Sequence, residues 1–156
     1  MNGLELLKQD HRKVMELFRQ VTMTRDTERR KELFNEIKDE IEVFTKAEEA
    51  LVYPTLRRHE ELQDIVHEAY EEHRQAKMLI RKIESLIADN EDFDTRLKML
   101  GDNLERHFEE VENVMFTRGK TIFDSEQLEL LGQDLEIAKG RFQQDFEKRS
   151  TANGRA

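Results

Sequence analysis

Apolar residues recur at helical spacing along most of this chain, and little in the sequence interrupts them. Five stretches keep a period of about 3.6 residues: residues 3–24, 27–57, 61–89 and 93–118, and a last segment that starts after Ser125. The chain holds one proline and six glycines, so it offers few of the turns that a β-sheet needs. The pattern predicts an all-α protein, an up-down-up-down four-helix bundle followed by a fifth, C-terminal helix.

Local signals indicate where these helices begin and end. Asp26, residues 90–92 and Ser125 are suited to be N-caps. Pro54 predicts that the second helix bends or ends near Tyr53. We expect the bundle in residues 1–120, a C-terminal helix packed on the same domain in residues 121–149, and a frayed tail in residues 150–156.

Composition and charge exclude several classes of protein. The formal net charge is -9 and the charges are interspersed, which argues against a nucleic-acid partner because phosphate binding needs a basic patch. The absence of cysteine excludes disulfides, thiolate metal sites and cysteine nucleophiles. No apolar run approaches the roughly 18 residues of a membrane span, and the N-terminus has no signal pattern. We expect a cytoplasmic protein with no membrane partner.

Four polar residues fall inside the apolar stripes: His11, Glu48, His73 and His107. A buried polar group without a partner costs about 1–3 kcal/mol. A hydrogen bond within the core explains any one of them alone. Four at once favour a partner that they share, provided that they meet.

The sequence repeats in a way that brings these positions together. Residues 10–21 align with residues 72–83, and residues 44–53 align at nearly the same offset with residues 107–116. The bundle is therefore predicted to arise from a duplicated helical hairpin, in which Phe44 is the counterpart of His107. With antiparallel helices that rise about 1.5 Å per residue, the aligned positions fall in one layer. Three imidazoles with carboxylates and no thiolate suit iron, manganese or zinc.

The chain resembles the hemerythrin-like, or HHE cation-binding, family over residues 4–118. The resemblance rests on residues 7–11, on residues 48–54 with their closing Tyr-Pro, on Glu72-His73, and on His107 with Glu112. It implies a di-iron centre in which His11, His73 and His107 are ligands and Glu48 and Glu112 are bridging carboxylates.

The sequence leaves open how Glu112 reaches the centre and whether Glu48 or Glu49 is the carboxylate ligand. Glu112 lies off the ideal helical stripe, so we expect a local distortion such as a π-bulge to turn it inward. Glu49, its counterpart in the repeat, is an alternative carboxylate to Glu48.

Phe44 departs from the family pattern, which has a ligand histidine there. In hemerythrin the oxygen-binding iron is the one served by the histidines that match His11 and Phe44. The resemblance therefore implies that one iron position is weak or empty, and that reversible oxygen carriage is not the function.

We expect a non-haem iron protein that binds or senses iron, oxygen, peroxide or nitric oxide, more readily a binding protein than an enzyme. A weak oxidase or peroxide-consuming enzyme is one alternative. The other is a metal-free interaction bundle that has lost the site, in which Phe44 is an ordinary core aromatic.

Overall fold

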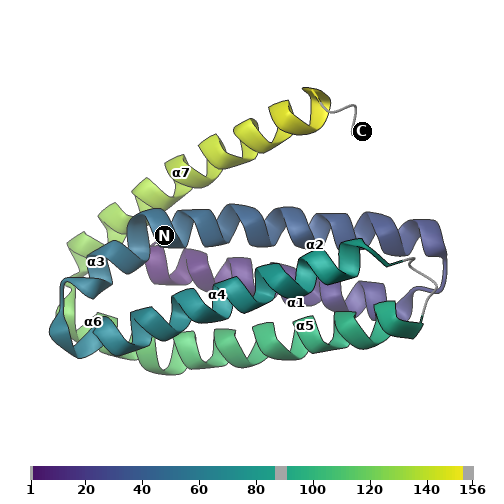
Figure 1. Ribbon diagram of the computed structural model, residues 1–156. Helices are drawn as coiled ribbons and strands as arrows, with labels where there is room; N and C mark the ends of the chain where they lie inside the picture. Colours follow the sequence, from purple (N-terminus) through teal and green to yellow (C-terminus); the bar gives the residue numbers. More distant parts are fainter. Residues whose placement is uncertain (1, 87–90, 153–156) are drawn as a thin grey trace.

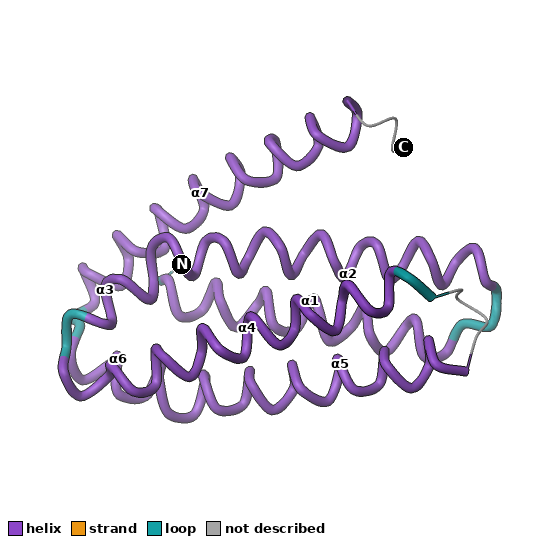
Figure 2. The backbone as a smooth tube through the Cα atoms, viewed as in Figure 1, coloured by secondary structure: helices purple, strands orange, loops and turns teal. Residues whose placement is uncertain are grey.

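A computed structural model describes residues 2–86 and 91–152. Within these residues all regular structure is helical and no strand occurs (Figure 2). The all-α prediction is confirmed. Among the described helices, none is both long and apolar enough to cross a membrane.

Four long helices form an antiparallel bundle, with a fifth helix leaning across it (Figure 1). The bundle helices are α1 (Gly3–Met23), α2 (Thr27–Ala47), α4 (Gln63–Glu84) and α5 (Glu91–Glu110), and the fifth is α7 (Ser125–Ala152). Five short elements connect them: η1 (Glu48–Val52), α3 (Tyr53–Arg57), η2 (Glu60–Leu62), η3 (Val111–Met115) and α6 (Phe116–Ile122). The four-helix bundle with a fifth C-terminal helix is therefore confirmed.

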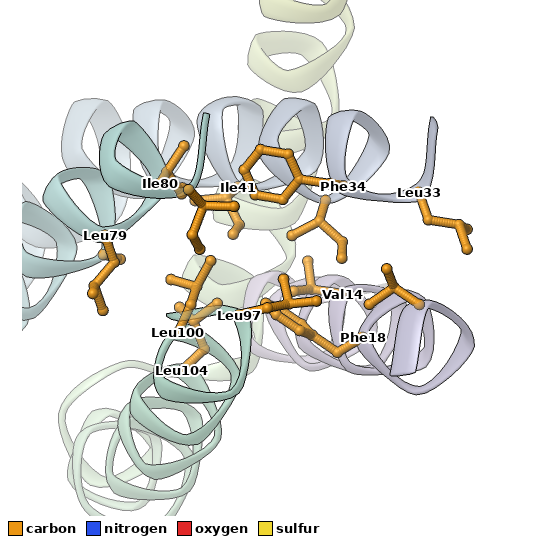
Figure 3. Packing of buried hydrophobic residues seen from close by; sticks show 14 of the residues in the cluster. Val14, Phe18, Leu33, Phe34, Ile41, Leu79, Ile80, Leu97, Leu100 and Leu104 are labelled. Carbon is orange, nitrogen blue, oxygen red and sulfur yellow. The ribbon is translucent and has the colours of Figure 1, made fainter. Parts of the chain in front are cut away.

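Two apolar clusters fill the bundle. One includes Val14, Phe18, Ile41, Ile80 and Leu100 and is drawn in Figure 3. The other cluster lies at the opposite end of the bundle. Its members include Leu7, Val52, Tyr53, Ala69, Val111 and Phe116. His11 and His73 lie between the residues of one cluster and those of the other, and Glu48 and His107 lie beside the point on their own helices where the two clusters meet. The polar layer thus divides the core into two halves.

Some helices are capped by the residues that the sequence predicted, and others are not. Asn2 caps α1, because its Oδ1 accepts a 2.9 Å hydrogen bond from the Glu5 amide. Asp26 is the N-cap of α2 but makes no side-chain capping bond. The N-cap at residues 90–92 is only partly testable, since residue 90 lies outside the described part of the chain and α5 starts at Glu91.

The prediction that Ser125 caps the last helix is wrong. Asp124 Oδ1 accepts from the Gln127 amide at 2.8 Å, and Gln127 Oε1 accepts from the Asp124 amide at 2.9 Å. This reciprocal pair satisfies backbone donors that the helix leaves unbonded at its N-terminus. Ser125 is the first residue inside α7.

Pro54 does not end the second helix, which continues through it to Arg57. The turn just before the proline, η1, is a π-helix, in which the Tyr53 amide bonds to the carbonyl of Glu48. A π-turn inserts one extra residue into the helix and changes the direction of the side chains that follow. A second π-turn, η3, lies at the equivalent place in the repeat, where there is no proline. The wide turn is therefore a property of both hairpins and not a consequence of Pro54.

Helix α7 packs against α1 and α2. Leu128 and Leu135 bury their side chains there, and Lys139 Nζ lies 2.5 Å from Asp10 Oδ1. The helix continues to Ala152, into the segment predicted to fray; the last residues of that segment, 153–156, lie outside the described residues.

Candidate metal centre

The structure brings His11 of α1, Glu48 of η1, His73 of α4 and His107 of α5 into the layer between the two apolar clusters. All four side chains are buried. The rings of His73 and His107 are 5.2 Å apart between centroids. Glu48 Oε2 lies 3.7 Å from His73 Nε2.

Several donor atoms of this layer lack protein partners. Both ring nitrogens of His11, Nε2 of His107 and Oε1 of Glu48 are buried and make no hydrogen bond. Such atoms are rare in folded proteins and call for an explanation, of which a bound ion is one. Imidazole nitrogens with a carboxylate oxygen form a donor set that suits iron, manganese or zinc, so the residues fit a metal ion.

Electrostatics keep the imidazole of His11 in the form that can bind a cation. Burial, followed by the nearby His107 and His73, lowers the pKa of His11 from 6.5 to about 3. The ring is therefore neutral at physiological pH, the form that binds a metal. Burial also raises the pKa of Glu48 above its usual value, an effect that the neighbouring histidines and Tyr53 oppose. A bound cation would favour the ionised form of this carboxylate.

Tyr53 is a member of the site that our sequence reasoning did not assign. Its hydroxyl donates a 2.7 Å hydrogen bond to Glu48 Oε2 and lies 3.0 Å from His73 Nε2. The two residues are five positions apart, and the π-turn between them lets both face the core. The available signal was the Tyr-Pro that closes the motif at residues 48–54.

Glu48 and Glu49, the two alternative carboxylates, face different atoms. Glu48 is 1% exposed and points to the centre of the layer. Glu49 is 26% exposed, and its Oε1 lies 3.4 Å from Nδ1 of His73, on the outer side of that ring. The geometry favours Glu48 as the inner carboxylate.

Glu112 lies in η3, and the π-distortion expected around it is present. Its Oε1 is 3.9 Å from Nδ1 of His11, beyond hydrogen-bonding distance, and the side chain is half-buried. Glu112 is thus near the His11 side of the layer. Its role as a ligand stays a prediction.

Comparison with known proteins identifies the family of this chain. A family model described as the hemerythrin HHE cation binding domain matches residues 2–118. The chain belongs to this hemerythrin family. Membership implies a metal cofactor.

A solved structure and a curated protein are also similar to this chain. A crystal structure of a hemerythrin HHE cation binding domain-containing protein from Mycobacterium kansasii is similar with a TM-score of 0.87 at 23% identity, covering 99% of this chain and 95% of that one. It supports the fold. A protein named DNA nickase from Nostoc sp. (strain PCC 7120 / SAG 25.82 / UTEX 2576) is 27% identical over 154 residues, which are 99% of this chain and 44% of that protein. The HHE chain thus spans less than half of the length of this relative.

The layer is more polar around His73 and His107 than around His11. Around His73 and His107 lie Tyr53, Glu48 and further carboxylates. Around His11 the neighbours are aromatic: its ring stacks on Phe108 with centroids 3.9 Å apart and meets the edge of Phe44 at 6.2 Å. Phe44, which stands where the resemblance predicted a ligand histidine, is buried and offers no donor atom.

An acidic groove lies beside the layer, between α4 and α5. One carboxylate oxygen each from Glu68, Glu72 and Glu110 fall within 4.8 Å of one another. Burial and the nearby charges of Glu72 and Glu68 raise the pKa of Glu110. His107 also lines the groove, and its Nδ1 lies 2.7 Å from Glu72 Oε2. Our sequence reasoning missed this group, although the spacing of Glu68 and Glu72 puts them on one face of a helix.

Proposed function

We propose that this chain is a non-haem iron protein that binds or senses iron, oxygen, peroxide or nitric oxide in the cytoplasm. The observation that carries the proposal is that donor atoms of His11, Glu48 and His107 are buried in one layer without a protein partner. A metal-free bundle would leave each of them at a cost of roughly 1–3 kcal/mol. That cost favours a metal-binding protein over an interaction bundle that has lost its site.

We propose two metal positions, of which the first has more donor side chains than the second. His73, His107 and Glu48 are proposed to hold the first ion, because Glu48 lies 3.7 Å from His73 and the two rings are adjacent. His11 and Glu112 are proposed to serve a second position, which lacks the donor that Phe44 replaces. When bound, iron in such a donor set supplies a coordination position open to a small ligand and a change of oxidation state.

DNA cleavage, suggested by the name of the Nostoc relative, is not proposed here. A net charge of -9 opposes contact with phosphates, and the match covers 44% of that protein. An oxidase or peroxide-consuming activity is the enzymatic alternative, and turnover of peroxide by the iron-loaded protein would separate it from binding or sensing.

Metal content tests the proposal most directly. His107→Ala should lose most of the iron that the parent protein binds, measured by elemental analysis after anaerobic loading and desalting. His67→Ala is the matched control, because His67 is an exposed histidine on the same bundle. Equal iron in His107→Ala and the parent would contradict the assignment of this layer as the metal centre.

A further inference from the structure

Two imidazoles of the layer have a carboxylate on the side that faces away from its centre. His107 Nδ1 lies 2.7 Å from Glu72 Oε2, and His73 Nδ1 lies 3.4 Å from Glu49 Oε1. The Nε2 atom of His107 is buried and has no partner in the protein. The shorter of these two contacts, from Glu72, is well within the range of a hydrogen bond to a charged acceptor.

Glu72 is placed so that it acts on the ring without losing its own hydration. Its side chain is 22% exposed and lines the acidic groove, whereas the His107 side chain is 3% exposed. A carboxylate that accepts from Nδ1–H fixes the ring in the tautomer whose lone pair is on Nε2. That lone pair is then available to a cation in the centre of the layer, and the orientation of the ring is held.

The repeat supplies an internal comparison for this contact. Asp10 is the counterpart of Glu72, and Phe44 is the counterpart of His107. Asp10 therefore has no imidazole to hold. Its Oδ1 binds Lys139 of α7 at 2.5 Å, and its Oδ2 is buried without a partner.

We propose that Glu72 is a positioning residue of the metal centre and sets the tautomer and orientation of His107. Asp10 occupies the equivalent position in the first hairpin, but it has no imidazole to position because Phe44 stands in place of the histidine. This inference rests on the proposed metal-binding function. It goes further by assigning a role to the acid that precedes the histidine on the first helix of each hairpin.

Cobalt(II) titration of the apo-protein tests the role of Glu72, with the visible cobalt bands as a readout of ligand geometry. Glu72→Ala should weaken cobalt affinity about 10- to 100-fold and shift the visible bands. Glu72→Gln, which keeps an acceptor for Nδ1–H without the charge, should recover part of that affinity. Glu68→Ala is the matched control, since it removes one negative charge from the same groove and should leave both readouts close to those of the parent.

The role proposed for Asp10 is tested in the parent chain and in the Phe44→His variant. Asp10→Asn should leave cobalt affinity unchanged in the parent chain, but should lower it about 10-fold or more when Phe44 is changed to histidine. If the Phe44→His chain does not fold, the comparison of Glu72→Ala with Glu68→Ala decides alone. Cobalt binding that is equal in Glu72→Ala and the parent, or equally weakened in Glu68→Ala, overturns the positioning role only. A parent protein that binds no cobalt overturns the metal-binding function, and this inference with it.

Discussion

Phe44 is the residue at which the chain departs from the ligand pattern that its family resemblance implied. It is buried against His11 and Phe108, in a place where the counterpart in the other hairpin is His107. Because both hairpins have the same local geometry around the layer, the backbone at Phe44 is suited to an imidazole. Under the proposed function, the second metal position is therefore limited by a missing donor and not by a missing space.

Phe44→His should therefore raise iron content above that of the parent and give new absorption in the near-ultraviolet and visible range. The apo-protein should become less stable by roughly 1–3 kcal/mol, since a polar ring replaces an apolar one in the core. Saturating metal should reverse this loss, because a ligand at about a hundredfold excess over its Kd stabilises the folded state by about 2.7 kcal/mol. Iron analysis and urea unfolding with and without metal measure both effects.

Phe44→Leu is the control, because it disturbs the same packing without adding a donor. It should bind no more iron than the parent. If Phe44→His also binds no more iron, the position opposite His11 is not a metal position.

At the scale of elements, two ion pairs between α7 and the bundle differ in their burial. The Asp10–Lys139 pair is 8% and 20% exposed, whereas the Glu42–Arg149 pair is 29% and 56% exposed. Burial raises the pKa of Asp10, although Lys139 opposes that shift. Breaking a buried pair leaves an uncompensated charge in the core and costs much more than breaking an exposed one.

Lys139→Met should destabilise the protein by about 3 kcal/mol, measured by urea unfolding. Arg149→Met is the matched control on the same helix and should cost less than about 1 kcal/mol. The double change of Asp10→Asn with Lys139→Met should recover a large part of the loss, since it removes the stranded charge. Equal costs for the two single variants would show that α7 does not depend on the buried pair.

At the scale of the whole molecule, the buried layer makes the stability of the apo-protein depend on pH. The pKa of His11 falls from 6.5 in the unfolded chain to about 3 in the folded one. Between these values the unfolded chain binds a proton that the folded chain does not. The contribution of His11 therefore lowers the free energy of unfolding as the pH falls below 6.5.

His11→Leu removes this contribution, so the stability difference between variant and parent should grow by about 1.4 kcal/mol per pH unit below 6.5. Unfolding in urea between about pH 7 and pH 5, with metal removed, measures the slope. His67→Leu replaces an exposed histidine and should leave the slope unchanged. A difference between His11→Leu and the parent that does not vary with pH would mean that His11 titrates normally in the folded protein.

Several features of this protein follow from the sequence alone. The helical period gave the long helices, since one proline and few glycines left no competing structure. The repeat of residues 10–21 and 44–53 placed His11, His73 and His107 at one height, because the rise per residue is fixed by backbone geometry. Family membership was also readable, from motifs that the family match over residues 2–118 confirms.

Other features were decided only by the tertiary structure. The π-turn at residues 48–52 shifts hydrogen bonds by one residue, which decides that Glu48 and Tyr53 face the core and Glu49 does not. The equivalent turn around Glu112 was expected because Glu112 lies off the helical stripe, but no local pattern indicated one at residues 48–52. Lys139 meets Asp10 across 129 positions of chain, a pairing that depends on how α7 packs against the bundle. Helical period and height are properties of single helices, whereas these contacts depend on the packing of several.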